Sequence, residues 1–269
     1  MFIAALPMYD WPEVRAETDA LWERLALALR HEGFGAPERL ARRNADLPSM
    51  PGGIRDRLGQ LIAPDPATLP PDGLDLATLW RHPMLLFSQT CWGPMETGLE
   101  PHVQVLAQPD YTAYEGGEGG LYSSAIVMRR SEVPQPVPAP AARHAVVPIA
   151  ALRGKRFVYN DPTSLSGFLG LKRDLKAAGK TLSLFSETVE TGAHRASALA
   201  VAEGKADIAA IDCRSWSLLC QFEPASAELA VAGWTARRPG LPFITSRKTP
   251  SQHLATMRRV LMREIPMAS

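Results

Sequence analysis

The amino-acid sequence predicts an α/β fold that is divided into two lobes. Short apolar runs alternate with longer segments of helical periodicity, a pattern typical of mostly parallel strands covered by helices on both faces. A glycine-rich run at 116–120 interrupts this alternation, which resumes beyond it. The 24 prolines and 20 glycines among 269 residues also indicate many turns and long loops.

The first series opens with an apolar strand that ends at Leu6, followed by an amphipathic helix over 11–32. Asp10 is expected to cap this helix, and Glu13 three residues later would complete a capping box. Gly33 stands where the helix would stop. The rest of the series is a loop, a short helix and two strands, expected at 48–71, 74–81, 84–87 and 103–107.

A second series follows the glycine-rich run. Residues 122–129 are predicted to form a strand, and the prolines between 134 and 140 a stiff, extended loop. Strands are then expected at 156–160, 182–185, 207–211, 229–235 and 242–245, with helices at 164–178 and 193–203. In the terminal helix, Thr249 would be the cap, Pro250 the first residue and Gln252 the capping-box partner.

The end of the chain decides the predicted domain organisation. The final strand and helix are too small to fold alone, so we expect them to return to the first lobe. The chain would then cross between the lobes twice, near the glycine-rich run and near Pro239-Gly240. We therefore predict one lobe of residues 1–115 and 236–269 and a second lobe of residues 116–235, with a ligand cleft between them.

The composition excludes several classes of protein. With 29 Lys and Arg against 28 Asp and Glu, the formal net charge is +1, and 46% of the residues are hydrophobic. Disordered chains have the opposite character, and nucleic-acid-binding proteins usually carry a basic face. Because no run of about 18 apolar residues is present, no membrane insertion is expected.

The cysteines and the first residues carry no signal for a metal site or for export. Cys91, Cys213 and Cys220 are odd in number and lack CxxC spacing, so we expect free thiols, with no metal and no cofactor. No Lys or Arg precedes the short apolar run at the amino terminus. The chain as given is therefore expected to carry no secretory signal.

Candidate functional residues follow the predicted strands, because ligands of α/β sheets gather where strands end and helices begin. In the first lobe these junctions contain Tyr9, and then Gln89 and Thr90 in the sequence Ser-Gln-Thr-Cys. Each has a structural alternative, since Tyr9 would also cover the first helix and Thr90 would also cap the next one.

The richest junction is Asn-Asp-Pro-Thr-Ser-Leu-Ser-Gly at 160–167. The N–H groups and the dipole at the start of the following helix favour a bound anion, and the hydroxyls of Ser164 and Ser166 can donate to it. The run has no GxxxxGK motif, so it is not a nucleotide P-loop. Helix capping is the alternative interpretation of the same serines.

Two later junctions add a histidine and an acid. Thr191 is expected to cap a helix whose first turn contains His194, where the helix dipole favours the neutral imidazole. Asp212 follows an apolar strand, and an acid there is easier to explain as facing a ligand than as part of the core. Residue types alone would also allow a triad of Cys91, His194 and Asp212, but no nucleophile elbow or papain-like context supports it.

At these junctions the sequence resembles the PhnD-like phosphonate-binding substrate-binding proteins of ABC transporters. The motifs that carry the resemblance are Leu-Arg-Gly-Lys-Arg at 152–156, the run at 160–167, Glu-Thr-Gly-Ala-His-Arg-Ala-Ser at 190–197, Ala-Asp-Ile-Ala-Ala-Ile-Asp at 206–212 and Pro-Gly-Leu-Pro-Phe at 239–243. Leu-Pro-Met-Tyr at 6–9 and Ser-Gln-Thr-Cys at 88–91 fit a branch of the same family.

The resemblance implies a type II periplasmic-binding-protein fold, in which two α/β lobes with mixed, mostly parallel sheets close over a small oxyanion ligand. It assigns the anionic head group to the Ser-x-Ser-Gly turn. It implies ligand contacts at Tyr9, Gln89, Thr90, Ser164, Ser166, Gly167, His194 and Asp212. It also implies an ABC transporter permease as partner, and a periplasmic location if a signal has been removed.

The resulting hypothesis is a non-catalytic solute-binding protein for a phosphonate, a phosphate ester or a similar ligand. An enzyme on the same fold is the alternative, with His194 as acid/base and Asp212 orienting the substrate, because a fold does not determine a function. An intracellular ligand sensor is a further alternative.

Overall fold

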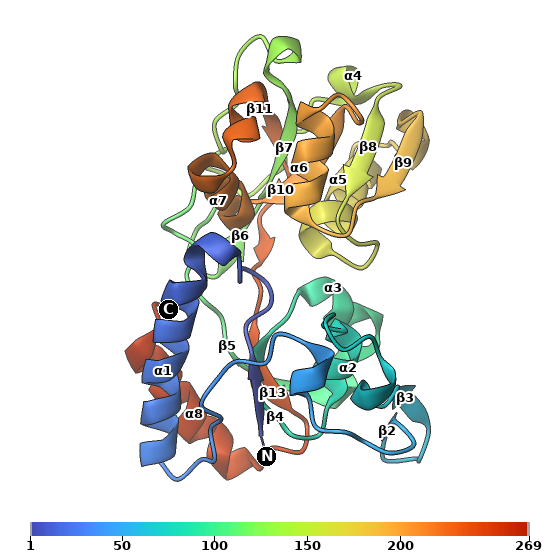
Figure 1. The fold of residues 1–269 in the computed structure, drawn as a ribbon. Helices are drawn as coiled ribbons and strands as arrows, with labels where there is room; N and C mark the ends of the chain where they lie inside the picture. The colour runs from blue at the N-terminus through green and yellow to red at the C-terminus, as the bar shows by residue number, and fades with distance from the viewer. Residues whose placement is uncertain (1, 268–269) are drawn as a thin grey trace. The chain divides into compact units, whose positions relative to one another are not determined.

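The structure, a computed structural model, describes residues 2–267 and confirms the predicted α/β class (Figure 1). The described chain forms two compact units. Unit 1 contains residues 2–109 and 241–267, and unit 2 contains residues 110–240. Each unit has a mixed sheet of its own with helices packed against it.

The sheet of unit 1 has the strand order β1-β4-β13-β5. Strand β1 (Ile3–Ala5) is parallel to β4 (Leu85–Gln89). Strand β13 (Phe243–Ser246) is antiparallel to both β4 and β5 (Val103–Ala107). The last strand of the chain therefore lies inside the sheet that the first strand begins.

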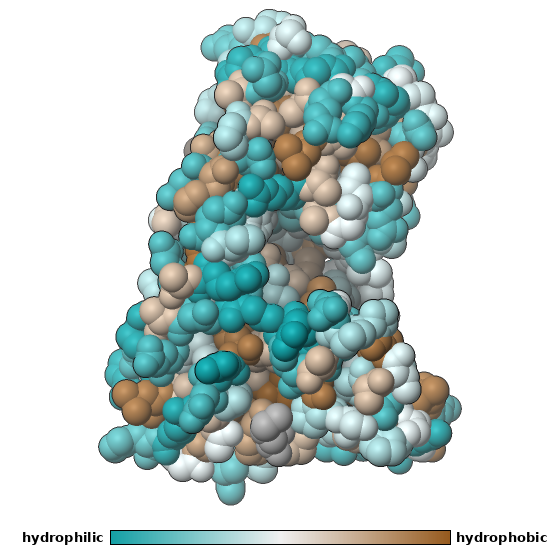
Figure 2. Space-filling view, in the orientation of Figure 1, coloured by the Kyte–Doolittle hydropathy of each residue, from teal (hydrophilic) through white to brown (hydrophobic). Residues whose placement is uncertain are grey.

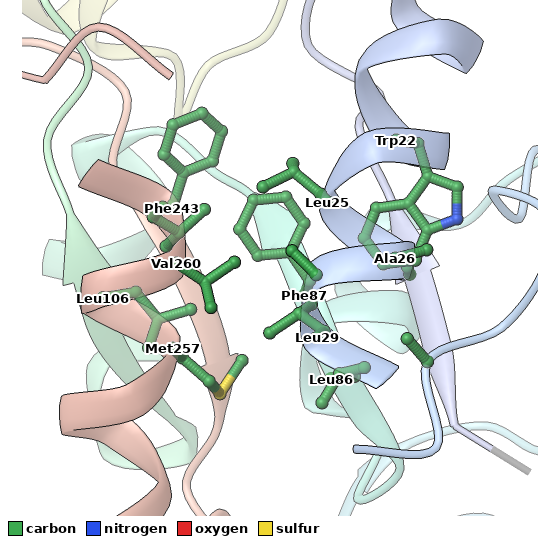
Figure 3. Close-up of a cluster of buried hydrophobic side chains, with 14 of the residues drawn as sticks. Trp22, Leu25, Ala26, Leu29, Leu86, Phe87, Leu106, Phe243, Met257 and Val260 are labelled. Atoms are coloured by element: carbon green, nitrogen blue, oxygen red, sulfur yellow. The ribbon is translucent and has the colours of Figure 1, made fainter. Parts of the chain in front are cut away.

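Both faces of this sheet are buried. Helices α1 (Arg15–His31) and α8 (Ser251–Glu264) pack together on one face, where Phe87 stacks between Trp22 and Phe243 with ring centroids 5.9 and 5.1 Å apart (Figure 3). Helix α2 (Leu76–Arg81) contributes to the cluster on the other face. Because successive side chains of a strand point to opposite faces, neighbours such as Leu85 and Leu86 belong to different clusters.

The sheet of unit 2 has the strand order β11-β7-β10-β8-β9. Its parallel strands are β10 (Ile208–Asp212), β8 (Arg156–Tyr159) and β9 (Glu187–Glu190), and β7 (Ser124–Arg129) is antiparallel to its neighbours β10 and β11 (Leu229–Trp234). The helices of the unit are α4 (Ile149–Leu152), α5 (Gly170–Ala177), α6 (His194–Ala202) and α7 (Cys213–Phe222). A two-stranded ribbon pairs β6 (Leu121–Tyr122) with β12 (Arg238–Pro239).

Shorter elements complete the two units. Unit 1 also contains the hairpin of β2 (Ile54–Arg55) and β3 (Leu61–Ala63) and the short helix α3 (Trp92–Pro94). Single 3-10 or π-helical turns lie at Pro12–Val14, Asn44–Asp46, Pro66–Thr68, Met95–Leu99, Glu100–His102, Arg130–Glu132, Leu165–Leu169, Leu182–Leu184 and Pro224–Glu228.

The expected start of the first helix is wrong, whereas its end is confirmed. Asp10 does not cap the helix, because both of its carboxylate oxygens accept hydrogen bonds from Arg42, at 2.5 and 3.1 Å. The chain instead enters α1 through a 3-10 turn at Pro12–Val14. Gly33 ends the helix in the left-handed conformation, at φ +87°, where a side chain would be strained.

Three other local expectations are also wrong. The segment 48–71 is not all loop, because Asp56 accepts the N–H groups of Leu58 and Gln60 and closes the β2–β3 hairpin. The strand expected at 182–185 is replaced by the 3-10 turn Leu182–Leu184, which Thr181 caps, and the strand lies further along, at β9. The cap of α8 is Pro250 and not Thr249, whose hydroxyl lies 2.8 Å from that of Thr245.

Figure 2 shows a mostly hydrophilic face on each unit, with apolar side chains in small, separate patches. None of the described helices is both long and apolar enough to cross a membrane. Within residues 2–267, the cysteines form no disulfide, and no group of three or more acid, His or Cys side chains is arranged to hold a metal ion.

Candidate functional site

The Ser-x-Ser-Gly run lies where a strand of unit 2 leads into a helix. Strand β8 ends at Tyr159, and Ser164 is the N-cap of the π-helical turn Leu165–Leu169 that continues into α5. The Ser164 hydroxyl accepts the N–H of Gly167 at 3.1 Å. The first N–H groups of a helix have no partner within it, so this turn presents donors and the positive end of a helix dipole.

Gly167 allows this turn to pack against its neighbours. A Cβ at this position would lie 1.8 Å from Oδ1 of Asn160 and 3.3 Å from Cε1 of His194. No side chain fits there, although the backbone of Gly167 is not in the left-handed region. Oδ1 of Asn160 is itself buried and accepts no hydrogen bond from the described residues.

His194 and Asp212 lie beside the same turn. The Nε2 of His194 is 2.9 Å from the Ser166 hydroxyl and 3.3 Å from Oδ2 of Asp212. The other carboxylate oxygen of Asp212 accepts the N–H groups of Arg214 and Ser215, at 3.1 and 3.0 Å, and so caps α7. One acid therefore both starts a helix and faces the imidazole.

The environment of His194 favours the neutral ring. Burial lowers the pKa of His194, and the opposing effects of the Asp212 carboxylate and the backbone carbonyl of Ala210 do not compensate. Nε2 faces both the Asp212 carboxylate and the Ser166 hydroxyl. The Nδ1 atom is buried and makes no hydrogen bond of good geometry with the described residues.

The lowered pKa of His194 predicts that this histidine makes the protein less stable in mild acid. As the pH falls below 6.5, the ordinary value, the unfolded chain binds a proton at His194 before the folded chain does. We expect the free energy of unfolding to fall less in His194→Gln than in the wild type between about pH 7.5 and about pH 5.5. Urea titrations at both pH values measure this difference, and equal losses in the two proteins would contradict the prediction.

The start of α6 differs from the expectation and adds a second set of donors. Thr191 does not cap this helix, because its hydroxyl bonds to the carbonyl of Tyr159 and to the hydroxyl of Ser197. Ala193 is the N-cap residue and has no side-chain cap. Since His194 contacts the Gly167 turn, two helix starts adjoin at one place in unit 2, an arrangement that suits an anion.

Residues that the sequence does not single out support this turn from beneath. The Ser124 hydroxyl donates to the carbonyl of Ser166 at 3.0 Å, and the Ser124 N–H donates to the Thr235 hydroxyl at 2.8 Å. Ser124 is opposite Asp212 in the register of β7 and β10. In the sequence, Ser124 is recognisable only as a serine at the start of an apolar strand. That position does not reveal that its hydroxyl will bond to the Ser164–Gly167 turn.

The remaining candidates lie in unit 1, at the ends of β1 and β4. Tyr9 is buried, and the Gln89 side chain donates to the carbonyl of Leu241 at 3.0 Å. The Thr90 N–H donates to the carbonyl of Pro242, whereas its buried hydroxyl makes no hydrogen bond with the described residues. Because β1 and β4 are parallel neighbours, these three residues share one edge of the unit 1 sheet.

The arrangement around His194 does not form a hydrolytic triad. In a Ser-His-Asp triad the serine and the acid contact different ring nitrogens, whereas here Ser166 and Asp212 face the same one. The neighbouring Cys213 is no nucleophile either, since burial and then the Asp212 charge raise the pKa of its thiol. The geometry around His194 is that of a hydrogen-bonding site.

Much of the chain matches the model of a known protein family. Residues 96–266 match the model of a family described as ABC transporter, phosphonate, periplasmic substrate-binding protein. The chain belongs to this family. The matched residues include the Ser-x-Ser-Gly turn, His194 and Asp212 of unit 2, and most of the returning segment of unit 1.

Solved structures share the fold of this phosphonate-binding family member. A binding protein component of an ABC phosphonate transporter from Pseudomonas aeruginosa superposes with a TM-score of 0.61 at 15% identity, over 100% of this chain and 81% of that one. PhnD1 from Prochlorococcus marinus, in complex with methylphosphonate, has a TM-score of 0.59 at 14% identity, over 97% and 83% of the two chains. A Xanthomonas citri protein bound to ATP has a TM-score of 0.59 at 13% identity, over 97% and 82%.

These similarities confirm the type II periplasmic-binding-protein fold that the sequence predicts. No curated protein sequence matches the chain.

Proposed function

We propose that this protein binds a small ligand with an oxyanion head group, such as a phosphonate or a phosphate ester, and does not transform it. The observation that carries the proposal is the junction of two helix starts, where the Ser164–Gly167 turn meets the first turn of α6. Membership of the phosphonate-binding family supports the same ligand class.

The unit 2 residues have distinct roles in this proposal. Ser164 and Ser166 present hydroxyls, and Gly167 lets their turn pack against Asn160 and His194. His194, neutral and beside Ser166, adds a ring that can accept or donate a hydrogen bond. Asp212, which is 2% exposed, orients His194 and caps α7.

Unit 1 would supply the second set of ligand contacts through Tyr9, Gln89 and Thr90. The units act as lobes that close over the ligand, with the chain crossings near residues 109–110 and 240–241 as hinges. Closure would then present the loaded protein to the permease of an ABC transport system, the partner that the family description implies.

Thermal-shift titrations with methylphosphonate, phosphate and a phosphate ester test this function. We expect at least one of them to raise the unfolding temperature, because a ligand that binds only the folded state stabilises it. Ser166→Arg, which fills the turn, should abolish the shift, and Ser166→Ala should weaken affinity by about tenfold. Ser186→Arg places the same side chain on an exposed site and should bind normally.

If Ser166→Arg bound the ligand with wild-type affinity, the Ser164–Gly167 turn could not be the ligand-binding site. If the protein were an enzyme, the wild type would convert a candidate metabolite to a product. The variant His194→Gln would then lose this turnover but would still bind the metabolite. We expect the same ligand to be recovered unchanged by mass spectrometry after incubation with the wild type.

A further inference from the structure

A cavity lined by several charged side chains lies in unit 1, far along its sheet from Gln89 and Thr90. It has a volume of about 340 Å³ and is bounded by the β2–β3 hairpin, the end of α2, the turn before β5 and the residues after β13. The hairpin packs beside α2 (Figure 1). Pro83 precedes β4, so the cavity is at the edge where β4 begins, whereas Gln89 ends that strand at the opposite edge.

Positive charge is concentrated in this cavity. Its cationic lining residues are Arg55, Arg57, Arg81, Arg247 and Lys248. Asp56 is its one lining carboxylate, and an oxygen of that side chain already accepts the N–H groups of Leu58 and Gln60 in the hairpin. A protein with a net charge of +1 thus places a local excess of cations in one hollow.

These cations lie outside the ion pairs that hold several other arginines of the unit. Arg42 pairs with Asp10 and Asp19, Arg43 with Asp46, and Arg259 with Glu32. Among residues 2–267, by contrast, no carboxylate lies within ion-pair distance of any cation that lines the cavity. The carboxylates of Asp56 and Asp75 act on this group only from beyond that distance, so most of the mutual repulsion is left to solvent or to a bound anion.

Arg81 shows that the cavity is more than a group of exposed side chains. Its side chain is partly buried, and burial lowers the pKa of its guanidinium. Burial likewise lowers the pKa of His102, and the charge of Arg81 lowers it further against the opposing effect of Asp56, which favours the neutral imidazole. A desolvated cation beside a neutral donor is a suitable partner for phosphate oxygens.

We propose that this cavity binds a soluble ligand that carries two or more phosphate groups, independently of the oxyanion site in unit 2. Several separate cations match a chain of phosphates better than they match a single head group. The apolar lining of Ile54, Ile62 and Pro101 leaves room for an organic group attached to that chain.

Isothermal titration with inorganic tripolyphosphate tests the proposal. We expect one binding event whose affinity falls between about 50 mM and about 200 mM NaCl, because the contacts are ionic. Arg81→Gln and Arg247→Gln should each weaken binding by about tenfold. Arg24→Gln removes an equally charged, exposed side chain of α1 and should leave the affinity unchanged.

Both cavity variants should remain folded, since each removes a repelled charge, and an unchanged or higher unfolding temperature without ligand checks this.

Ser166→Arg should retain tripolyphosphate binding, so failure of the unit 2 site leaves this test intact. Loss of binding in Ser166→Arg, with normal binding in both cavity variants, would overturn the proposal. Arg81-dependent sedimentation with phosphatidylglycerol vesicles, without tripolyphosphate binding, would overturn it in favour of a lipid surface.

Discussion

Replacement of Gly167 by alanine is expected to abolish oxyanion binding and to destabilise unit 2. The added Cβ would lie 1.8 Å from Oδ1 of Asn160, so either the turn or the end of β8 must shift. Overpacking of this kind costs about 1–3 kcal/mol of folding free energy. The shift would also displace the Ser166 hydroxyl from Nε2 of His194, from which it is now 2.9 Å away.

Urea denaturation measures the loss of stability, and thermal-shift titration with the oxyanion measures the loss of binding. Gly73→Ala is the matched control, because a Cβ at Gly73 meets its nearest neighbours at 3.8 Å and the backbone there is not left-handed. We expect this control to bind normally. Normal affinity in Gly167→Ala would show that the turn does not hold the ligand.

Truncation of Asp174 is expected to have a larger effect on stability. Asp174 lies on α5 and accepts two hydrogen bonds from the guanidinium of Arg238, at 2.5 and 3.2 Å, and one from the N–H of Ala236 at 3.0 Å. The side chains of Asp174 and Arg238 are 7% and 17% exposed. Asp174→Ala would leave a largely buried cation without its partner, which costs about 3–5 kcal/mol.

The same denaturation experiment tests this prediction. Glu203→Ala breaks the exposed pair of Glu203 and Lys205 and should cost less than about 1 kcal/mol. The double variant Asp174→Leu/Arg238→Met should recover much of the loss, because two apolar side chains leave no buried charge. If Asp174→Ala cost no more than Glu203→Ala, the pair would contribute nothing to the fold.

This pair illustrates a contact that the sequence does not reveal. Asp174 appears in the sequence as one polar residue of an amphipathic helix, and Arg238 as part of a turn near Pro239-Gly240. They meet because β12 returns the chain past the start of α5. Ion pairs between residues far apart in the chain depend on the topology of the fold. Local sequence patterns do not predict that topology.

Local sequence patterns predicted the structure correctly where a single residue or a short run of apolar residues determines it. The apolar runs at β4, β5 and β10 are strands because their side chains fill both faces of a sheet, and Gly33 ends α1 because it alone tolerates a positive φ there. The capping predictions failed at Asp10, Thr191 and Thr249. In each case the side chain found a partner that lies elsewhere in the fold or one turn away.

For the candidate site, the sequence alone determined that the Ser-x-Ser-Gly turn would place N–H groups and hydroxyls at a helix start, since these are local properties. Only the tertiary structure decided that His194 and Asp212 adjoin it, because β8 and β10 are parallel neighbours whose ends meet at one edge. The cationic cavity of unit 1 is likewise a product of the fold. Its positive charges come from three separated segments of a nearly neutral chain, and only their packing places them around one hollow.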